Sequence, residues 1–134
     1  FMHCDASQML GKVTISLDDM DVDYASISAH KAYGPKGIGA CYIRGGSPRA
    51  ALNPLLRGGG QESGLRSGTL NVPGIVGFGK ACQLIPSALD EDAKRIGSIR
   101  DYFERRVEDL YPETIVIGKS TRRLPGTSCL FISL

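Results

Sequence analysis

The side chains of this 134-residue chain that could perform chemistry stand at the ends of two strand-like segments. They are a carboxylate, an amide, a hydroxyl, an imidazole and an amine, carried by Asp5, Gln8, Ser28, His30 and Lys31. A lysine amine can form an imine with an aldehyde, a carboxylate can keep a pyridine nitrogen protonated, and hydroxyl and imidazole groups can donate hydrogen bonds to a phosphate. A pyridoxal phosphate (PLP) site requires these groups, although composition alone favours an exposed, inert role for any single lysine.

The segments around Lys31 predict a sheet that places this lysine at a strand end. Residues 23–30 and 38–44 carry strand-forming side chains, and a Gly-Pro turn lies between them. Loops at strand ends, held by a rigid sheet, often carry catalytic groups. The separation of Asp5 and Lys31 suits a crossover between neighbouring strands. We therefore expect both side chains near the ends of adjacent strands.

Residues 45–71 predict a long loop with a functional role. They are rich in Gly, Pro, Ser and Asn, a composition that does not form a regular helix or strand. A loop of this length is uncommon inside a compact domain unless it binds a ligand or crosses to a partner.

Two helices are predicted next. The first occupies residues 72–85 and ends before Pro86, and the second begins after Ser87 or Asp90 as its N-cap and ends near Leu110. Apolar side chains are spaced along one face of the second helix, a pattern that amphipathic packing explains. These side chains are Ile96, Ile99, Phe103, Val107 and Leu110.

Two short strands are predicted at the end of the chain, over residues 114–118 and 128–134. The order of elements indicates an α/β domain followed by the beginning of another, with a boundary within residues 86–112.

Composition excludes several function classes. The chain has 42% hydrophobic and 22% charged residues and a net charge of +2, so neither a nucleic-acid-binding face nor a membrane helix is expected. Four scattered cysteines favour a reducing compartment. Strand-like residues at both ends suggest a fragment of a longer protein. We expect a cytoplasmic location, or the mitochondrial matrix in a eukaryote, and no metal site.

Four motifs in this order resemble those of the cysteine desulfurases, in the class V branch of the fold-type I PLP enzymes. They are HCDASQ, SISAHKAYGPKGIGACYIR, GGGQESGLRSGT and RLPGT. The third motif points to the housekeeping group of the family. The resemblance implies an α/β fold, the fold-type I large domain with a mainly parallel sheet. Residues 1–86 would then be the C-terminal part of the PLP-binding large domain, and 87–134 a connecting helix and the beginning of the small α+β domain.

The resemblance also assigns roles to individual residues. Lys31 would hold PLP as a Schiff base and move protons at the substrate. Asp5 would pair with the pyridinium nitrogen and Gln8 would hydrogen-bond the phenolic oxygen. Ser28 and His30 would donate to the cofactor phosphate.

Thr69 matches a family residue that reaches the cofactor phosphate of the neighbouring subunit. The resemblance therefore implies a homodimer whose active site is built across the subunit interface. The remaining loop residues, including Gln61, Arg66 and the adjacent glycines, indicate only a tight backbone turn.

The family also uses a mobile-loop cysteine that takes the substrate's sulfur as a persulfide. None of Cys4, Cys41, Cys82 and Cys129 matches it, and we expect each of them to be a core or packing residue. The parent enzyme would convert L-cysteine to L-alanine and pass sulfane sulfur to iron–sulfur scaffold proteins or to thiolation pathways. The isolated fragment, which also lacks the substrate-carboxylate arginine, would be incomplete for catalysis.

Other interpretations remain open. The cofactor residues would serve equally in another class V PLP enzyme, such as an aminotransferase or a selenocysteine lyase. The chain could instead be a non-catalytic dimerisation or docking module. A nucleotide-binding domain is disfavoured, because neither glycine-rich segment has the spacing of a P-loop or of a dinucleotide fingerprint.

Overall fold

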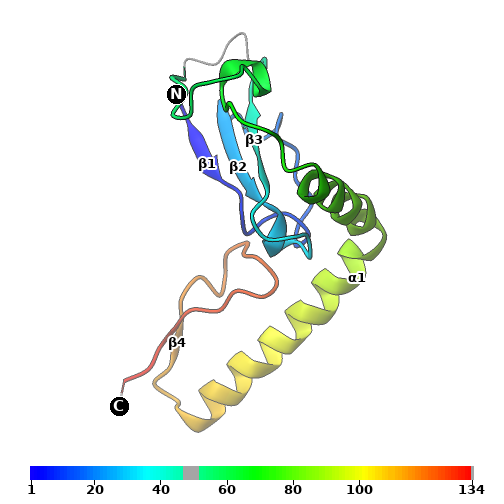
Figure 1. Ribbon diagram of the computed structural model, residues 1–134. Coiled ribbons are helices and arrows are strands. Elements are labelled where there is room, and N and C mark those ends of the chain that lie inside the picture. Colours follow the sequence, from blue (N-terminus) through cyan, green and yellow to red (C-terminus); the bar gives the residue numbers. More distant parts are fainter. Residues whose placement is uncertain (47–51, 134) are drawn as a thin grey trace. The chain divides into compact units, whose positions relative to one another are not determined.

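The computed structural model describes residues 1–46 and 52–133. The chain divides into two compact units, Phe1–Ile85 and Pro86–Leu134. The long helix α1 (Val72–Leu110) contributes residues to both units (Figure 1). The division falls beside the predicted boundary, but the assignment of the units to a large and a small domain stays a prediction.

A three-stranded sheet forms the centre of the first unit. Its strands are β1 (His3–Asp5), β2 (Tyr24–Ser28) and β3 (Gly39–Ile43), in the order β1-β2-β3. β1 pairs with β2 in parallel, which confirms the predicted crossover between neighbouring strands. β3 pairs with β2 in antiparallel fashion, so the described sheet is mixed. One antiparallel strand on an otherwise parallel sheet is common in α/β proteins.

Alanines make up much of the core of the first unit, together with Val22 and Tyr24. The alanines buried there are Ala6, Ala25, Ala29 and Ala32. Alanine lets neighbouring backbone segments approach closely. The turns that follow β1 and β2 are therefore held directly against the sheet.

The loop before α1 is irregular, as predicted. Among its described residues, 45–46 and 52–71, the only helical segment is the short 3-10 turn η3 (Glu62–Gly64). Residues 47–51 of the predicted loop lie outside the described part of the chain.

The prediction of two helices separated at Pro86 is wrong. α1 is one helix of 39 residues with Pro86 inside it. A proline removes only one backbone hydrogen bond and strains one turn, at a cost of about 3 kcal/mol, and the helix-forming segments on both sides continue through it. The N-cap is Asn71, whose Oδ1 accepts a hydrogen bond from the Gly74 N–H at 3.1 Å, and neither Ser87 nor Asp90 begins a helix.

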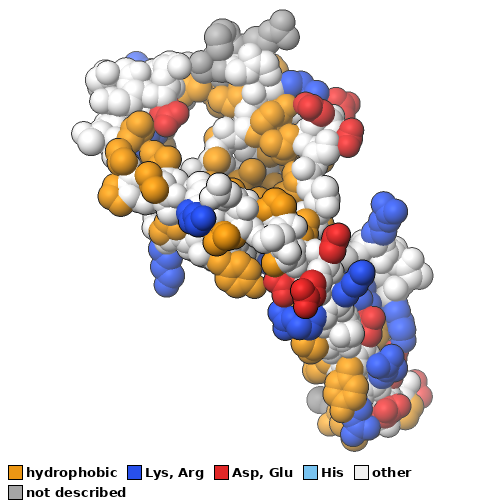
Figure 2. Space-filling view, turned by 90° about the vertical axis from the view of Figure 1, so that its right-hand side faces the viewer, with side chains coloured by type: hydrophobic (Ala, Val, Ile, Leu, Met, Phe, Trp, Pro, Cys, Tyr) orange, Lys and Arg blue, Asp and Glu red, His pale blue; other side chains and the backbone are white. Residues whose placement is uncertain are grey.

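In the second unit, two strands of two residues each follow α1 along the chain. β4 (Ile115–Val116) pairs in antiparallel fashion with β5 (Leu130–Phe131), and both are shorter than predicted. The amphipathic packing expected of the apolar helix face is only partial. Ile96 and Val107 are half-buried, but Ile99, Phe103 and Leu110 are 57%, 50% and 66% exposed. Two such short strands cannot cover a helix of this length. Figure 2 shows hydrophobic side chains reaching the surface among charged ones.

Candidate active site

Asp5 and Ser28 share one edge and one face of the parallel pair. Asp5 lies opposite Ser26 in the register. Ser28 is two residues further along β2, so it points to the same face as Ser26. β1 and β2 lie side by side in the sheet (Figure 1). Since parallel strands end at a common edge, the Asp5 carboxylate and the Ser28 hydroxyl lie on neighbouring strands at this edge.

The turn after β1 keeps the exposed Asp5 carboxylate ionised. Its Oδ1 accepts a hydrogen bond from the backbone N–H of Ser7 at 3.0 Å. Side-chain and backbone hydrogen bonds from Ser7 lower the pKa of the Asp5 carboxyl, and the electrostatic effect of His3 lowers it further. A full negative charge therefore stands at this strand end at neutral pH, as a protonated pyridine nitrogen requires.

Gln8 lies on the exposed side of the same turn. Its Oε1 accepts a hydrogen bond from the Lys12 ammonium group. The amide nitrogen of Gln8 has no partner within residues 1–46 and 52–133, so this group is available as a donor. The predicted contact between Gln8 and a phenolic oxygen stays a prediction.

The turn after β2 carries the other three predicted groups. The 3-10 turn η1 (Ala29–Lys31) follows Ser28 directly, and the Ser28 hydroxyl oxygen lies 2.9 Å from His30 Nδ1. Ser28 and His30 therefore stand together, as two donors to one phosphate must. Lys31 is exposed, and its ammonium group takes part in none of the ion pairs or hydrogen bonds found in the described residues.

Backbone contacts of Ala29 fix the turn that presents Lys31. The Ala29 carbonyl accepts hydrogen bonds from the N–H groups of Ala32 and Gly34, both at 2.9 Å. A Cβ at Gly34 would lie 2.9 Å from that carbonyl oxygen, so a side chain there would displace the turn. Tyr33 has a φ of 60°, a conformation that a non-glycine residue adopts only when its surroundings impose it. These residues therefore shape the turn that follows Lys31.

Thr69 stands apart from the other predicted site residues. It is exposed near the end of the loop, and no hydrogen bond in the described residues joins it to the other five. Its carbonyl accepts a hydrogen bond from Arg66 Nη1 at 3.4 Å. The chain therefore brings Asp5, Ser28 and Lys31 to one sheet edge, while Thr69 makes no hydrogen bond with that group in the described residues.

Two of the four cysteines contradict the expectation of burial. Cys41 and Cys129 are exposed, and Cys4 and Cys82 are half-buried. Cys41 is on β3, whose side chains are mostly accessible, and Cys129 precedes the two-residue strand β5. Neither has a lysine, arginine or histidine partner among the described ion pairs and hydrogen bonds, so nothing here identifies an activated thiolate.

Sequence reasoning missed the side chains that shape the loop before Thr69. Gln61 Oε1 accepts a hydrogen bond from the Gly68 N–H at 2.9 Å, and Arg66 Nη1 donates to the Gly68 carbonyl at 3.1 Å. The motif GGGQESGLRSGT contains both residues, but a motif does not reveal which of its side chains fold back on their own backbone.

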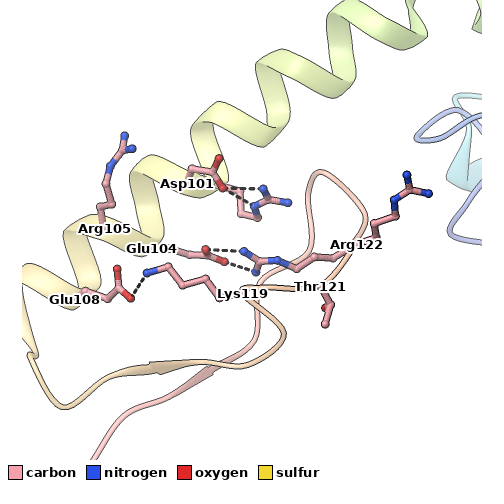
Figure 3. Close-up of a pocket in the computed structure, with 9 residues that line it drawn as sticks. Asp101, Glu104, Arg105, Glu108, Lys119, Thr121 and Arg122 are labelled. Carbon is pink, nitrogen blue, oxygen red and sulfur yellow. Dashed lines mark hydrogen bonds and ion pairs between the residues drawn. The ribbon is translucent and has the colours of Figure 1, made fainter.

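The second unit contains a charged cavity of about 580 Å³ between α1 and the segment that follows β4 (Figure 3). Among its lining residues, Nη1 and Nη2 of Arg123 each donate a hydrogen bond to one carboxylate oxygen of Glu104, at 2.6 and 2.9 Å. Ser128 donates a third hydrogen bond to Glu104, and Lys119 pairs with Glu108. The pairs that Asp101, Glu104 and Glu108 form neutralise three of the five cations that line the cavity, while Arg105 and Arg122 make no ion pair in the described residues. The Glu104–Arg123 pair joins α1 to the segment after β4, so we assign it a structural role.

Replacing Glu104 with glutamine should destabilise the second unit by about 3 kcal/mol, because Arg123 would lose its buried partner. The hydrogen bond from Arg123 lowers the pKa of Glu104 from 4.5 to about 2. A lowered folded-state pKa stabilises the fold above pH 4.5, and this contribution disappears as the pH falls towards 2. Thermal unfolding at several pH values should show the gap between parent and variant closing in that window.

A matched control for this prediction is Glu113→Gln. Glu113 is exposed and makes no ion pair in the described residues, so its substitution should change the free energy of unfolding by no more than about 0.5 kcal/mol. A Glu104→Gln variant that loses no more stability than Glu113→Gln at neutral pH would contradict the structural role of the ion pair.

Comparison with known proteins gives consistent matches along nearly the whole chain. The aminotransferase class-V family model matches residues 1–133. The chain is 46% identical over 135 residues to the mitochondrial cysteine desulfurase of Arthroderma benhamiae, covering 99% of this chain and 26% of that protein. It is 48% identical over 124 residues to the cysteine desulfurase IscS of Anaeromyxobacter dehalogenans, covering 92% and 30%. The chain thus spans less than a third of the length of these relatives.

Solved structures give the same result. A NifS-like protein superimposes with a TM-score of 0.80 and 45% identity, covering 96% of this chain and 34% of that one. A NifS-like protein from Rickettsia africae has a TM-score of 0.83 and 32% identity, covering 97% and 35%.

Proposed function

Because this chain belongs to the aminotransferase class-V family, we propose that it is the cofactor-holding part of a cysteine desulfurase. The whole protein, of which these residues would be one part, then converts L-cysteine to L-alanine and passes on sulfane sulfur. The observation that carries this proposal is the common edge of β1 and β2, where Asp5 and the Ser28–Lys31 turn follow adjacent parallel strands. The identity to proteins named cysteine desulfurases selects this reaction among those of the family.

The residues at this edge fit PLP. An ionised Asp5 suits the protonated pyridine nitrogen, and the adjoining Ser28 hydroxyl and His30 ring suit the phosphate. Lys31 offers an exposed primary amine for the aldehyde. When bound, PLP supplies an electron sink for the carbanion that deprotonation of an amino acid produces.

Each residue then has a distinct task. Asp5 would hold the proton on the pyridine nitrogen, and Ser28 and His30 would anchor the phosphate end. Gln8 would donate its amide N–H to the phenolic oxygen. Lys31 would hold the cofactor through its amine and would move a proton at the substrate's α-carbon. The rigid turn under Ala29 keeps the Lys31 amine at this edge.

Thr69 supplies a phosphate donor to a second copy of the protein in this proposal. Thr69 is exposed, and no hydrogen bond in the described residues joins it to the other site residues. Both features suit a role in the active site of a second subunit. Large apolar side chains within fifteen residues of Thr69 in the sequence are also exposed, as a subunit interface requires before assembly. These side chains are Leu55, Leu56, Leu70, Val72 and Val76.

The sulfur-accepting cysteine belongs to the rest of the whole protein in this proposal, since none of the four cysteines here matches it. Iron–sulfur scaffold proteins or thiolation enzymes would take the sulfur. No helix within residues 1–46 and 52–133 has the length and apolar character needed to span a membrane. We propose a cytoplasmic location, or the mitochondrial matrix in a eukaryote.

Incubation of the purified, PLP-loaded whole protein with L-cysteine and a thiol reductant tests this function. We expect alanine and sulfide in equal amounts, because each turnover releases one of each. Transfer of the amino group to a keto acid without sulfide would contradict the proposal and identify an aminotransferase. A mixture lacking L-cysteine but containing L-serine, which has no sulfur, is the matched control and should yield no sulfide.

A further inference from the structure

Two side chains in the first unit clamp the peptide groups on both sides of Gly68. Gln61 Oε1 accepts a hydrogen bond from the Gly68 N–H at 2.9 Å. Arg66 Nη1 donates to the carbonyl oxygens of Gly68 and Thr69 at 3.1 and 3.4 Å. The backbone N–H of Gly68 is therefore bound by Gln61, and its carbonyl oxygen is bound by Arg66.

Gly68 needs such a clamp because its own conformation is loosely determined. Its φ of 112° lies in the region that glycine alone adopts readily, and a glycine there has many competing conformations. The direction in which Thr69 leaves the loop depends directly on this φ. Without external contacts, the Thr69 hydroxyl would sample a wide range of positions.

The remainder of the loop supports the clamp. Glu62 and Ser63 have φ values of 53° and 56°, unfavourable for residues with side chains, so the surrounding contacts must hold them there. The buried Ser67 closes the loop, because its hydroxyl accepts a hydrogen bond from the Gly60 N–H at 3.3 Å and its N–H donates to the Leu56 carbonyl at 3.1 Å. These contacts therefore hold the backbone that carries Gln61 and Arg66 in one conformation.

We propose that Gln61 and Arg66 are positioning residues that aim the Thr69 hydroxyl at the cofactor phosphate of a neighbouring subunit. This inference rests on the proposed function. The two residues act through Thr69 and touch neither substrate nor cofactor. Arg66 reaches both carbonyl groups from one terminal nitrogen of a planar, pre-organised guanidinium, whereas the ammonium group of a lysine sits on a shorter, more flexible side chain.

A double-mutant cycle on PLP affinity in the whole protein tests this inference. Thr69→Ala should raise the Kd for PLP about tenfold or more, because a hydrogen bond to a charged group is lost. Gln61→Leu should weaken binding in the parent, and Gln61→Glu, which keeps an acceptor for the Gly68 N–H, should restore it. In the Thr69→Ala background, Gln61→Leu should have no further effect, because a positioning residue has nothing left to position.

Arg66→Lys provides a second test if the Gln61→Leu variant does not fold. This substitution should raise the Kd for PLP in the parent protein but not in the Thr69→Ala background. The matched control is Arg57→Lys, an exposed arginine of the same loop that makes no ion pair or hydrogen bond in the described residues, and it should leave the Kd unchanged.

The outcomes separate this inference from the function on which it rests. Effects of Gln61 or Arg66 that persist undiminished without the Thr69 hydroxyl would overturn the inference alone, and would show that these side chains act on the phosphate themselves or on the fold. A whole protein that binds no PLP, or whose Kd is unaffected by Thr69→Ala, would overturn the inference together with the proposed role of Thr69.

Discussion

Replacing Lys31 with alanine in the whole protein should lower desulfurase turnover by at least about 10³-fold, because one amine both holds the cofactor and moves the proton. The visible absorption band of the lysine-bound cofactor should also disappear. Lys31 is suited to this task because it is exposed, is not engaged in an ion pair within the described residues, and follows a turn fixed by Ala29. Alanine production and the absorption spectrum measure the two effects separately.

Lys36 is the matched control for this prediction. It is another exposed lysine, five residues further along the same Gly-Pro turn, and it makes no ion pair in the described residues. Lys36→Ala should leave both the spectrum and the turnover close to those of the parent. If the Lys31→Ala protein keeps a full-strength absorption band, Lys31 is not the residue that holds the cofactor.

Replacing Asp5 with asparagine should lower turnover about 10²- to 10³-fold, or about 3 to 4 kcal/mol of transition-state stabilisation. The amide keeps the shape of the carboxylate but cannot stabilise a proton on the pyridine nitrogen, so the cofactor loses its capacity as an electron sink. PLP should still bind, because Ser28, His30 and Lys31 remain. Measurement of kcat beside the PLP content of the purified variant distinguishes loss of chemistry from loss of cofactor.

The pH dependence of the Asp5 role follows from its lowered pKa. Since hydrogen bonds from Ser7 hold this carboxyl ionised below the usual aspartate range, activity should not fall through Asp5 protonation in weakly acidic solution. Asp18→Asn, at another exposed aspartate, is the control and should have normal turnover. An Asp5→Asn variant with parental kcat would contradict the pairing with the pyridine nitrogen.

The sequence predicted the parts of the fold that local patterns determine. Strands β1 to β3, the parallel pairing of β1 with β2 and the irregular loop all agree with the structure, and the fold-type I class agrees with the NifS-like structures. The residues that end these strands were recognisable because their chemical types and order match a family motif. Turn-forming glycines and strand-forming segments act over a few residues, which is why they can be read without tertiary structure.

The errors have physical causes that lie outside local pattern. Pro86 was taken as a helix end, but the lost hydrogen bond is one among many in a helix of 39 residues. The apolar face with Phe103 was expected to be packed, since periodicity indicates which side chains prefer burial and not what covers them. The clamps formed by Gln61 and Arg66 also escaped prediction, because side-chain contacts with a turn depend on dihedral angles that the sequence does not state.

The central claim is that Lys31 is the residue that holds the cofactor. Borohydride reduction of the PLP-loaded whole protein, followed by proteolysis and mass spectrometry, tests it most directly, because reduction makes the lysine–cofactor bond permanent. We expect the pyridoxyl mass on the peptide carrying Lys31, located on that residue by fragmentation. A stoichiometric label on Lys36, on Lys12 or outside this chain, with Lys31 unmodified, would contradict the account.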